Sequence, residues 1–337
     1  MSADPVRAIA DAVLYEGYIL WPYRRSALKN RQRWTFGGIY PRAHSEGRED
    51  DPWQLRTECL LEAGPGATVD VEVRFLHVVE RQVHRRSASG LEPVSELELG
   101  GERHLSWEEA TERELRADRL LVGELSETSL RIPLEIEAGS SPEELHDTDG
   151  SHAGTIVRSW QGLEGSVEIG VERLGDRLFR LGVSVSNETP WGGGEREAVM
   201  ALTLCSSHVV IRATGGEFVS LTDPPAELAG EAEACTNEGA WPVLVGEPGE
   251  LGTVLCSPII LEDHPRIAPE SPGDLFDGGE IDGMLVLNIL SLTEEEKAEM
   301  RASDPKAREI LDRTEALSED ELMALHGTIR EFSQVNR

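Results

Sequence analysis

The chain has 337 residues, of which 39% are hydrophobic and 28% are charged, a composition typical of a globular protein. Its formal charge is −31, and because such a field repels phosphate backbones, we expect no nucleic acid partner. No apolar run is long enough to cross a bilayer, so we expect no membrane insertion. The first residues have no basic region ahead of an apolar core, which predicts a cytoplasmic protein.

A short helix is predicted over residues 4–14. Asp4 is a suitable capping residue, and Pro5 follows it at the first helical position. Val6, Ile9 and Val13 then recur at the spacing of one helical face.

The next segment, residues 15–44, combines basic and aromatic side chains, and we call it the basic aromatic segment. Residues 1–48 carry +4, so the other 289 residues carry −35. We expect the rings to lie in the core and the arginines to pair with carboxylates of the acidic body, like a strap. The exposed remainder would be available to a protein partner. The partner-binding candidates are Trp21, Tyr23, Arg24, Arg25, Lys29, Arg31, Arg33 and Trp34.

The centre of the chain shows the alternation of β-strands. In residues 68–85, Val69, Val71 and Val73 alternate with charged residues, which predicts a half-buried strand. About ten such candidates, separated by turn residues, indicate an antiparallel β-sandwich or barrel-like body, as one large or two small sandwiches. The other candidates cover 129–138, 154–162, 165–174, 177–190, 198–213, 216–221, 241–246 and 252–261.

Two regions have the features of helices. Residues 106–121 begin with Ser106 and Glu109, which together form a capping-box pattern. The tail repeats the pattern at Thr293 with Glu296 and has an amphipathic stripe, which predicts a helical C-terminal segment. The predicted organisation is therefore a mainly β protein with a short N-terminal helix and basic aromatic segment (1–48), a β-rich body (49–290) and a helical C-terminal segment (291–337).

The chain contains no pattern of a known catalytic site. There is no nucleophile elbow and no phosphate-binding loop, and the four cysteines lie too far apart for a structural zinc motif. We therefore predict no catalytic residues and no cofactor.

One acidic loop, residues 262–282, is the candidate site for a divalent metal. Carboxylate oxygens are the ligands that calcium prefers, although the order of an EF-hand is not met. A solvated acidic loop explains the same residues. The candidate ligands are Asp263, His264, Asp274, Asp277, Glu280 and Asp282.

Two stretches carry a resemblance to a known family. Residues 15–41, "YEGYILWPYRRSALKNRQRWTFGGIYP", and most of residues 263–317 resemble an uncharacterised bacterial protein family. Genes of this family lie in clusters for uptake [NiFe]-hydrogenases in actinobacteria and some proteobacteria. The resemblance covers roughly a quarter of the chain and brings no established activity. It implies an accessory role in assembling or maturing a hydrogenase in the cytoplasm.

We therefore expect a non-catalytic accessory or assembly protein that binds a protein partner, namely a [NiFe]-hydrogenase subunit or a maturation factor. One alternative is a metal-binding protein or enzyme that uses the 262–282 loop. Another is a structural scaffold that dimerises through its helical tail.

Overall fold

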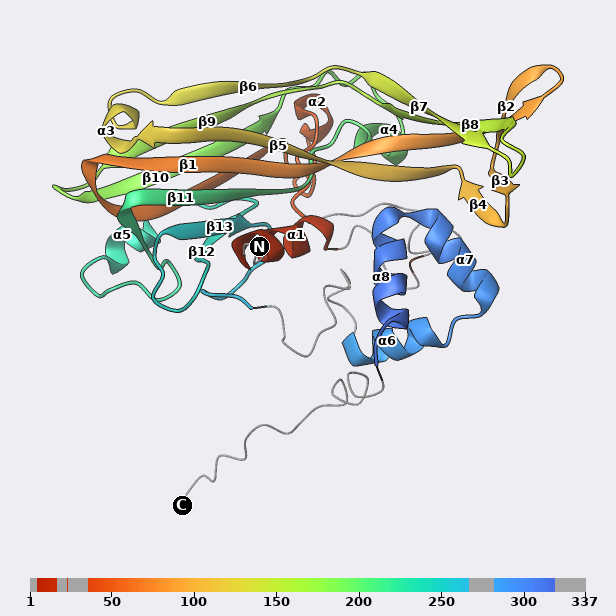
Figure 1. Cartoon of the computed structure of the whole chain (residues 1–337). Helices are drawn as coiled ribbons and strands as arrows, with labels where there is room; N and C mark the ends of the chain where they lie inside the picture. Colours follow the sequence, from red (N-terminus) through yellow and green to blue (C-terminus); the bar gives the residue numbers. More distant parts are fainter. Residues whose placement is uncertain (1–4, 17–22, 24–35, 267–281, 319–337) are drawn as a thin grey trace. The chain divides into compact units, whose positions relative to one another are not determined.

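A computed structural model of the chain describes residues 5–16, 23, 36–266 and 282–318 (Figure 1). The chain forms two compact units, residues 1–18 with 32–265 and residues 19–31 with 266–337. The protein is mainly β, with 49% strand and 20% helix, which confirms the predicted fold class. The helices are α1 (Pro5–Tyr15), α2 (Arg42–Ser45), α3 (Val122–Leu125), α4 (Arg196–Met200), α5 (Ala229–Glu233), α6 (Asp282–Leu290), α7 (Glu294–Ser303) and α8 (Pro305–Glu315). The strands are β1 (Gln54–Ser87), β2 (Gly90–Val94), β3 (Glu96–Leu99), β4 (Glu102–Leu105), β5 (Trp107–Leu121), β6 (Leu130–Ile136), β7 (Gly139–His146), β8 (His152–Trp160), β9 (Leu163–Arg173), β10 (Leu178–Asn187), β11 (Cys205–Val219), β12 (Trp241–Leu244) and β13 (Thr253–Ser257).

The 34-residue strand β1 organises the first unit. Its first part pairs with β10 and with the end of β11, and its middle pairs with β11 and β5. Between these parts, residues 64–67 are an irregular stretch that faces the single residue Gly215, which has a φ of 79°. This Gly-Pro-Gly-Ala stretch bends the strand, because several residues on one strand oppose one on its neighbour.

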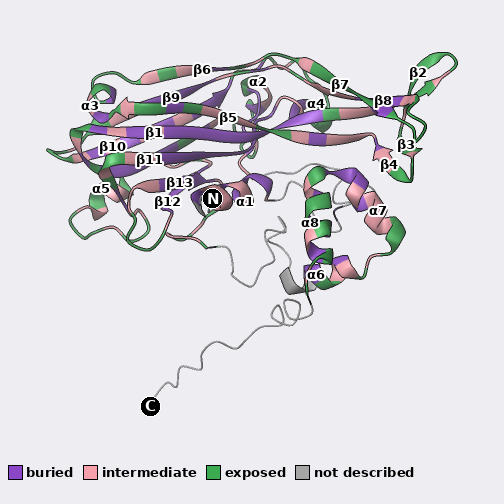
Figure 2. Cartoon of the chain, viewed as in Figure 1, coloured by how far each residue is buried: buried purple, intermediate pink, exposed green. Residues whose placement is uncertain are grey.

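The bend divides the sheet into two layers. Layer A is β6–β9–β10 with the first part of β1, and layer B is β5, the middle of β1, β11, β13 and β12. Leu61 and Cys59 in layer A and Val69, Val71 and Val73 in layer B all point into one shared core. Odd-numbered side chains of β1 thus face inward on both sides of the bend, and even-numbered ones face outward. Figure 2 shows that much of β1 is buried.

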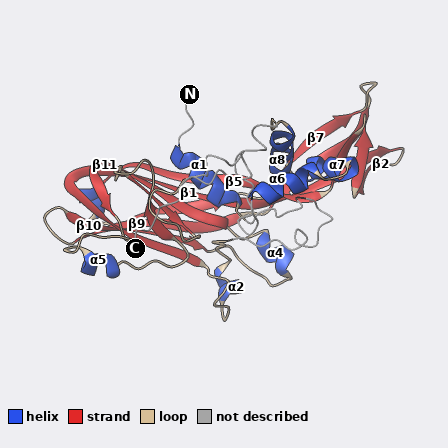
Figure 3. Ribbon diagram, turned by 90° about the horizontal axis from the view of Figure 1, so that it is seen from below, coloured by secondary structure: helices blue, strands red, loops and turns tan. Residues whose placement is uncertain are grey.

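The outer face of layer B is covered by α1, in agreement with the predicted N-terminal helix (Figure 3). Val6, Ala10 and Val13 pack on outward side chains of the sheet, including Val210 and Leu255. The helix therefore buries its apolar stripe against this layer.

The last part of β1 continues beyond both layers into a smaller arrangement of strands. It pairs there with β8 and β2, and β8 pairs with β7. Val83, Leu145 and Ile156 form a separate small core, against which Val94 and Leu97 pack. We call this part, together with β3 and β4, the arm.

The prediction of a helix over residues 106–121 is wrong, because residues 107–121 form the strand β5. The alanines, glutamates, arginines and leucines of this segment favour a helix, but the pairing with β1 decides its structure. Leu115 and Ala117 reach the core, while Glu112 and Glu114 face outward on the side where α1 lies. Long-range pairs thus outweigh the local preference.

The described helices of the second unit begin as the sequence predicts. Thr293 forms the capping box with Glu296 at the start of α7, and Asp304 caps α8 ahead of Pro305. The second predicted box, Ser318 with Glu321, lies outside the described residues. Among the described helices, no helix combines the length and the apolar character that a bilayer span requires.

Two glycines of β9 provide a matched test of this architecture. A side chain at Gly165 would place its Cβ 2.2 Å from the carbonyl oxygen of Ser186, so Gly165→Ala must displace backbone. We expect this change to lower the free energy of unfolding by about 3 kcal/mol. At Gly170 the nearest atom is Ser129 Cβ at 3.5 Å, so Gly170→Ala should cost less than about 0.5 kcal/mol. Urea unfolding of both variants measures the difference, and equal stability would contradict the packing of β9 on β10.

Candidate functional site

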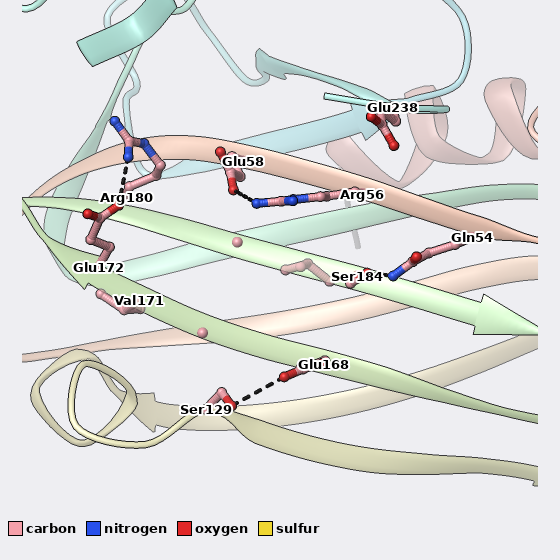
Figure 4. Close-up of a pocket in the computed structure, with 13 residues that line it drawn as sticks. Gln54, Arg56, Glu58, Ser129, Glu168, Val171, Glu172, Arg180, Ser184 and Glu238 are labelled. Carbon is pink, nitrogen blue, oxygen red and sulfur yellow. Dashed lines mark hydrogen bonds and ion pairs between the residues drawn. The ribbon is translucent and has the colours of Figure 1, made fainter. Parts of the chain in front are cut away.

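The outer face of layer A carries a polar pocket, which we call the sheet-face pocket (Figure 4). It has a volume of about 520 Å³ and lies over β1, β10 and β9. Its lining residues are Gln54, Arg56, Glu58, Ser129, Glu168, Gly170, Val171, Glu172, Arg180, Gly182, Val183, Ser184 and Glu238.

Strand register explains why these residues meet. Glu58 lies opposite Gly182, and Gly182 lies opposite Gly170, so one row across the three strands contains two glycines. Directly opposed residues point to the same face of a sheet. The row therefore has no side chains over β10 and β9, and backbone forms the floor of the pocket there.

Charged side chains come from the rows on either side of this floor. In one row Arg56 lies opposite Ser184, which lies opposite Glu168, and Glu168 in turn lies opposite Arg131 of β6. In the other row Arg180 of β10 lies opposite Glu172 of β9. The period of two thus places charges around the bare row and keeps the apolar residues of the same strands in the core.

Both arginines of the pocket already have carboxylate partners. Arg56 Nη2 lies 2.5 Å from Glu58 Oε1, and Arg180 donates to Glu172 and Glu231 at 2.6 and 3.0 Å. Burial lowers the pKa of Arg180, but its contact with Cys235 and its carboxylate neighbours outweigh this effect and raise the pKa. Both guanidinium groups therefore serve to hold the pocket together.

Two carboxylates of the pocket, Glu168 and Glu238, form no ion pair among the described residues, and Arg131, which lies opposite Glu168, pairs with Glu188. Glu168 accepts one hydrogen bond, from Ser129 Oγ at 3.3 Å, and the described residues place no basic group within ion-pair distance of Glu168 or Glu238. Four carboxylates and two guanidinium groups line the pocket, so its formal charge is −2. The pocket is thus suited to a cation.

The side of the pocket that carries Glu238 is fixed to β1 by its backbone. Arg56 and Glu238 exchange two backbone hydrogen bonds of 2.9 and 2.7 Å. Glu58 accepts from the backbone N–H of Thr236, and Asn237 accepts from the Glu58 backbone N–H. The position of Glu238 is therefore set independently of any ligand.

A second charged cluster lies on the outer face of layer B, and we call it the ionic cluster. Arg74, 1% exposed, contacts Asp11 of α1 at 2.6 Å and Glu112 at 3.3 Å. Arg7 of α1 contacts Glu72 at 3.1 Å and Glu114 at 2.9 Å. Tyr15 Oη also donates to Glu112. With Arg116 and Arg212, which both contact Glu72, the cluster has four arginines and four carboxylates and is neutral.

The two clusters differ in what covers them. The ionic cluster is closed by α1 and its charges balance, so it ties the helix to the sheet. Burial raises the pKa of Glu114, but hydrogen bonds from Arg116 and Arg7 outweigh it, and the pKa is lowered. The sheet-face pocket has an excess of carboxylates, so it is the better candidate for a binding site.

The structure places few of the residues that the sequence singled out for partner binding. Trp21, Arg24, Arg25, Lys29, Arg31, Arg33 and Trp34 lie outside the described residues. Tyr23 is described, and its side chain is fully buried, as expected for a core ring. The pairing of basic residues with the acidic body does occur in α1, at Arg7, a position that the basic aromatic segment does not include.

In the candidate metal loop, Asp263 and His264 have structural contacts. Asp263 accepts from the hydroxyls of Ser220 and Thr222 and from the backbone N–H of Leu244. His264 Nδ1 lies 3.2 Å from the carbonyl oxygen of Gly246. Asp274, Asp277 and Glu280 lie outside the described residues, as does the side chain of Asp282. Within the described parts of the chain no group of three metal-capable side chains converges, and the metal site stays a prediction.

Three of the four thiols are buried and not placed for reaction. All four cysteines are free, and Cys59, Cys205 and Cys256 are buried. Burial raises the pKa of Cys256 to about 12, so this thiol is protonated at neutral pH.

Sequence reasoning missed the sheet-face pocket. The available signal was a glycine at an outward position of two consecutive strands, in "VEIGVER" and "FRLGVSV". A glycine inside a strand weakens it, and it often marks a site where a ligand or another backbone approaches closely.

No protein-family model matches the chain, and no curated protein matches it.

The ionic cluster can be tested by removing its buried arginine. Arg74→Met leaves an excess carboxylate under α1, and we expect a loss of about 3 kcal/mol in the free energy of unfolding at pH 7. Arg131→Met is the control, because Arg131 and Glu188 form an exposed pair, 62% and 45% exposed, worth less than about 1 kcal/mol.

The pH dependence follows from Glu114. Its folded pKa is lowered, so its stabilisation is present at neutral pH, above the unfolded value, and is lost as the pH falls through the folded value. Arg7 donates one of the two hydrogen bonds that lower this pKa, so the cost of Arg7→Met relative to the parent should shrink in acid. An equal cost for Arg74→Met and Arg131→Met, or a cost of Arg7→Met that is independent of pH, would contradict the role of the cluster.

Proposed function

We propose that the chain is a non-catalytic accessory or assembly protein of the cytoplasm that binds a protein partner through the sheet-face pocket. The observation that supports binding is the pocket itself, on a sheet face where two carboxylates have no cation among the described residues. Its described lining offers hydroxyls, carboxylates, guanidinium groups and an amide but no histidine or cysteine, which favours recognition over nucleophilic catalysis.

The identity of the partner is proposed from the resemblance. Residues 15–41 and 263–317 are similar to a family encoded beside uptake [NiFe]-hydrogenases, so we propose a hydrogenase subunit or a maturation factor. The chain is strongly acidic, and complementary charge guides protein association. The proposed partner therefore presents a basic surface to the pocket.

The test is capture of the partner by the full-length chain from cells that grow on hydrogen. The pocket variant carries Glu168→Arg with Glu238→Arg, and the control carries Glu98→Arg with Glu144→Arg, which changes two exposed carboxylates of the arm by the same charge. We expect the parent and the control to capture a hydrogenase subunit or maturation factor, and the pocket variant to capture at least about tenfold less.

Thermal unfolding of all three proteins should be alike, since the four substituted side chains are exposed. Equal capture by the pocket variant and the control would contradict the pocket as the binding site. Capture of neither class of protein, together with unchanged hydrogenase activity after deletion of the gene, would contradict the function.

A further inference from the structure

We infer that the sheet-face pocket receives the guanidinium group of an arginine on an exposed basic segment of the partner. The inference builds on the proposed function and specifies the chemistry of the contact. It concerns the outer face of layer A, and α1 occupies the corresponding face of layer B.

The charge of the pocket selects a cation. Arg56 and Arg180 are satisfied by Glu58, Glu172 and Glu231, so an incoming anion would find carboxylates in excess. Glu168 and Glu238 each have acceptor oxygens to offer. The field of a chain with a net charge of −31 adds to this preference.

The floor of the pocket selects a flat cation. Gly182 and Gly170 are cross-strand neighbours, so peptide groups without side chains form the centre of the pocket. A guanidinium group is planar, is weakly hydrated on its faces and carries its N–H donors at its edges. It can lie on the peptide groups while its edge donates to a carboxylate, in the forked geometry that arginine forms with carboxylates. An ammonium group is compact and strongly hydrated, and it gains little from a flat floor.

The two glycines occupy positions where the fold itself does not require glycine. No turn explains them, because both lie inside paired strands and neither has a positive φ. Side chains would fit at both positions, with nearest contacts of 3.5 Å at Gly170 and 3.7 Å at Gly182. Packing within the described part of the chain therefore does not require glycine there, whereas close approach of a ligand to the backbone does.

The experiment is a titration of the full-length protein, followed by the amide NMR signals of Gly170 and Gly182. The probes are Nα-acetyl-arginine amide, Nα-acetyl-lysine amide and Nα-acetyl-citrulline amide. Citrulline keeps the planar shape of arginine but has no charge. We expect both glycine signals to shift with the arginine probe, the lysine probe to bind at least about fivefold more weakly, and the citrulline probe to cause no shift.

Variants separate the floor from the charge. The double variant Gly170→Ala with Gly182→Ala adds two methyl groups to the floor, and it should weaken the arginine probe at least about fivefold while leaving the lysine probe unchanged. Glu168→Gln should weaken both cationic probes, and the control Glu98→Gln in the arm should weaken neither. Circular dichroism of each variant confirms that the sheet is intact.

The outcomes distinguish this inference from the proposed function. Equal affinity for the arginine and lysine probes, or arginine binding that ignores the two alanines, would overturn the inference while partner capture through Glu168 and Glu238 still stands. Arginine binding at the glycines without any pocket-dependent capture would overturn the proposed partner. Shifts confined to residues outside the pocket would overturn the inference outright.

Discussion

The bend of β1 at residues 64–67 is the feature on which the rest of the first unit depends. The strand keeps its inward side chains on odd-numbered positions on both sides of the bend, so Leu61 and Val69 join one core although they belong to different layers. The outward positions of the same strand then supply Arg56 and Glu58 to one outer face and Glu72 and Arg74 to the other. A shift of one residue at the bend would exchange core and surface in one layer.

The outer faces of the two layers differ in how their charged side chains are paired. On layer B, four arginines and four carboxylates balance beneath α1, and hydrogen bonds such as Tyr15 to Glu112 satisfy further oxygens. Buried charges of this kind are costly unless they are fully paired. On layer A the pairing is incomplete, because Glu168 and Glu238 form no ion pair among the described residues, and Arg131 beside Glu168 pairs with Glu188 instead. An incomplete set of pairs around a backbone floor is what a binding surface for a cation requires.

Much of the fold could be predicted from the sequence, because alternation of apolar and polar residues is a local signal. Alternation correctly indicated an antiparallel β body, and capping residues with helical spacing correctly indicated the helix predicted over residues 4–14 and the capped helix at Thr293. Sequence reasoning failed for β5, where Glu112 and Glu114 favour a helix locally but pair with distant arginines. Arg74 lies 38 residues from Glu112 in the sequence, and Arg7 of α1 lies 107 residues from Glu114. The pocket was missed for a related reason. Gly182 and Gly170 lie opposite each other because of the register between β10 and β9, and this register cannot be read from composition or spacing. The basic aromatic segment, the other candidate surface, lies mostly outside the described residues and stays a prediction.

The central claim is that a protein partner contacts the outer face of layer A, and site-specific photo-crosslinking in hydrogen-grown cells tests it most directly. A photoreactive residue at Ser129, which is exposed and lines the pocket, is compared with the same residue at Ser89, which is exposed near the tip of the arm. The account predicts that Ser129 forms an adduct containing peptides of a hydrogenase subunit or maturation factor and that Ser89 does not. Adducts of equal yield at the two positions, or an adduct at Ser89 alone, would contradict it.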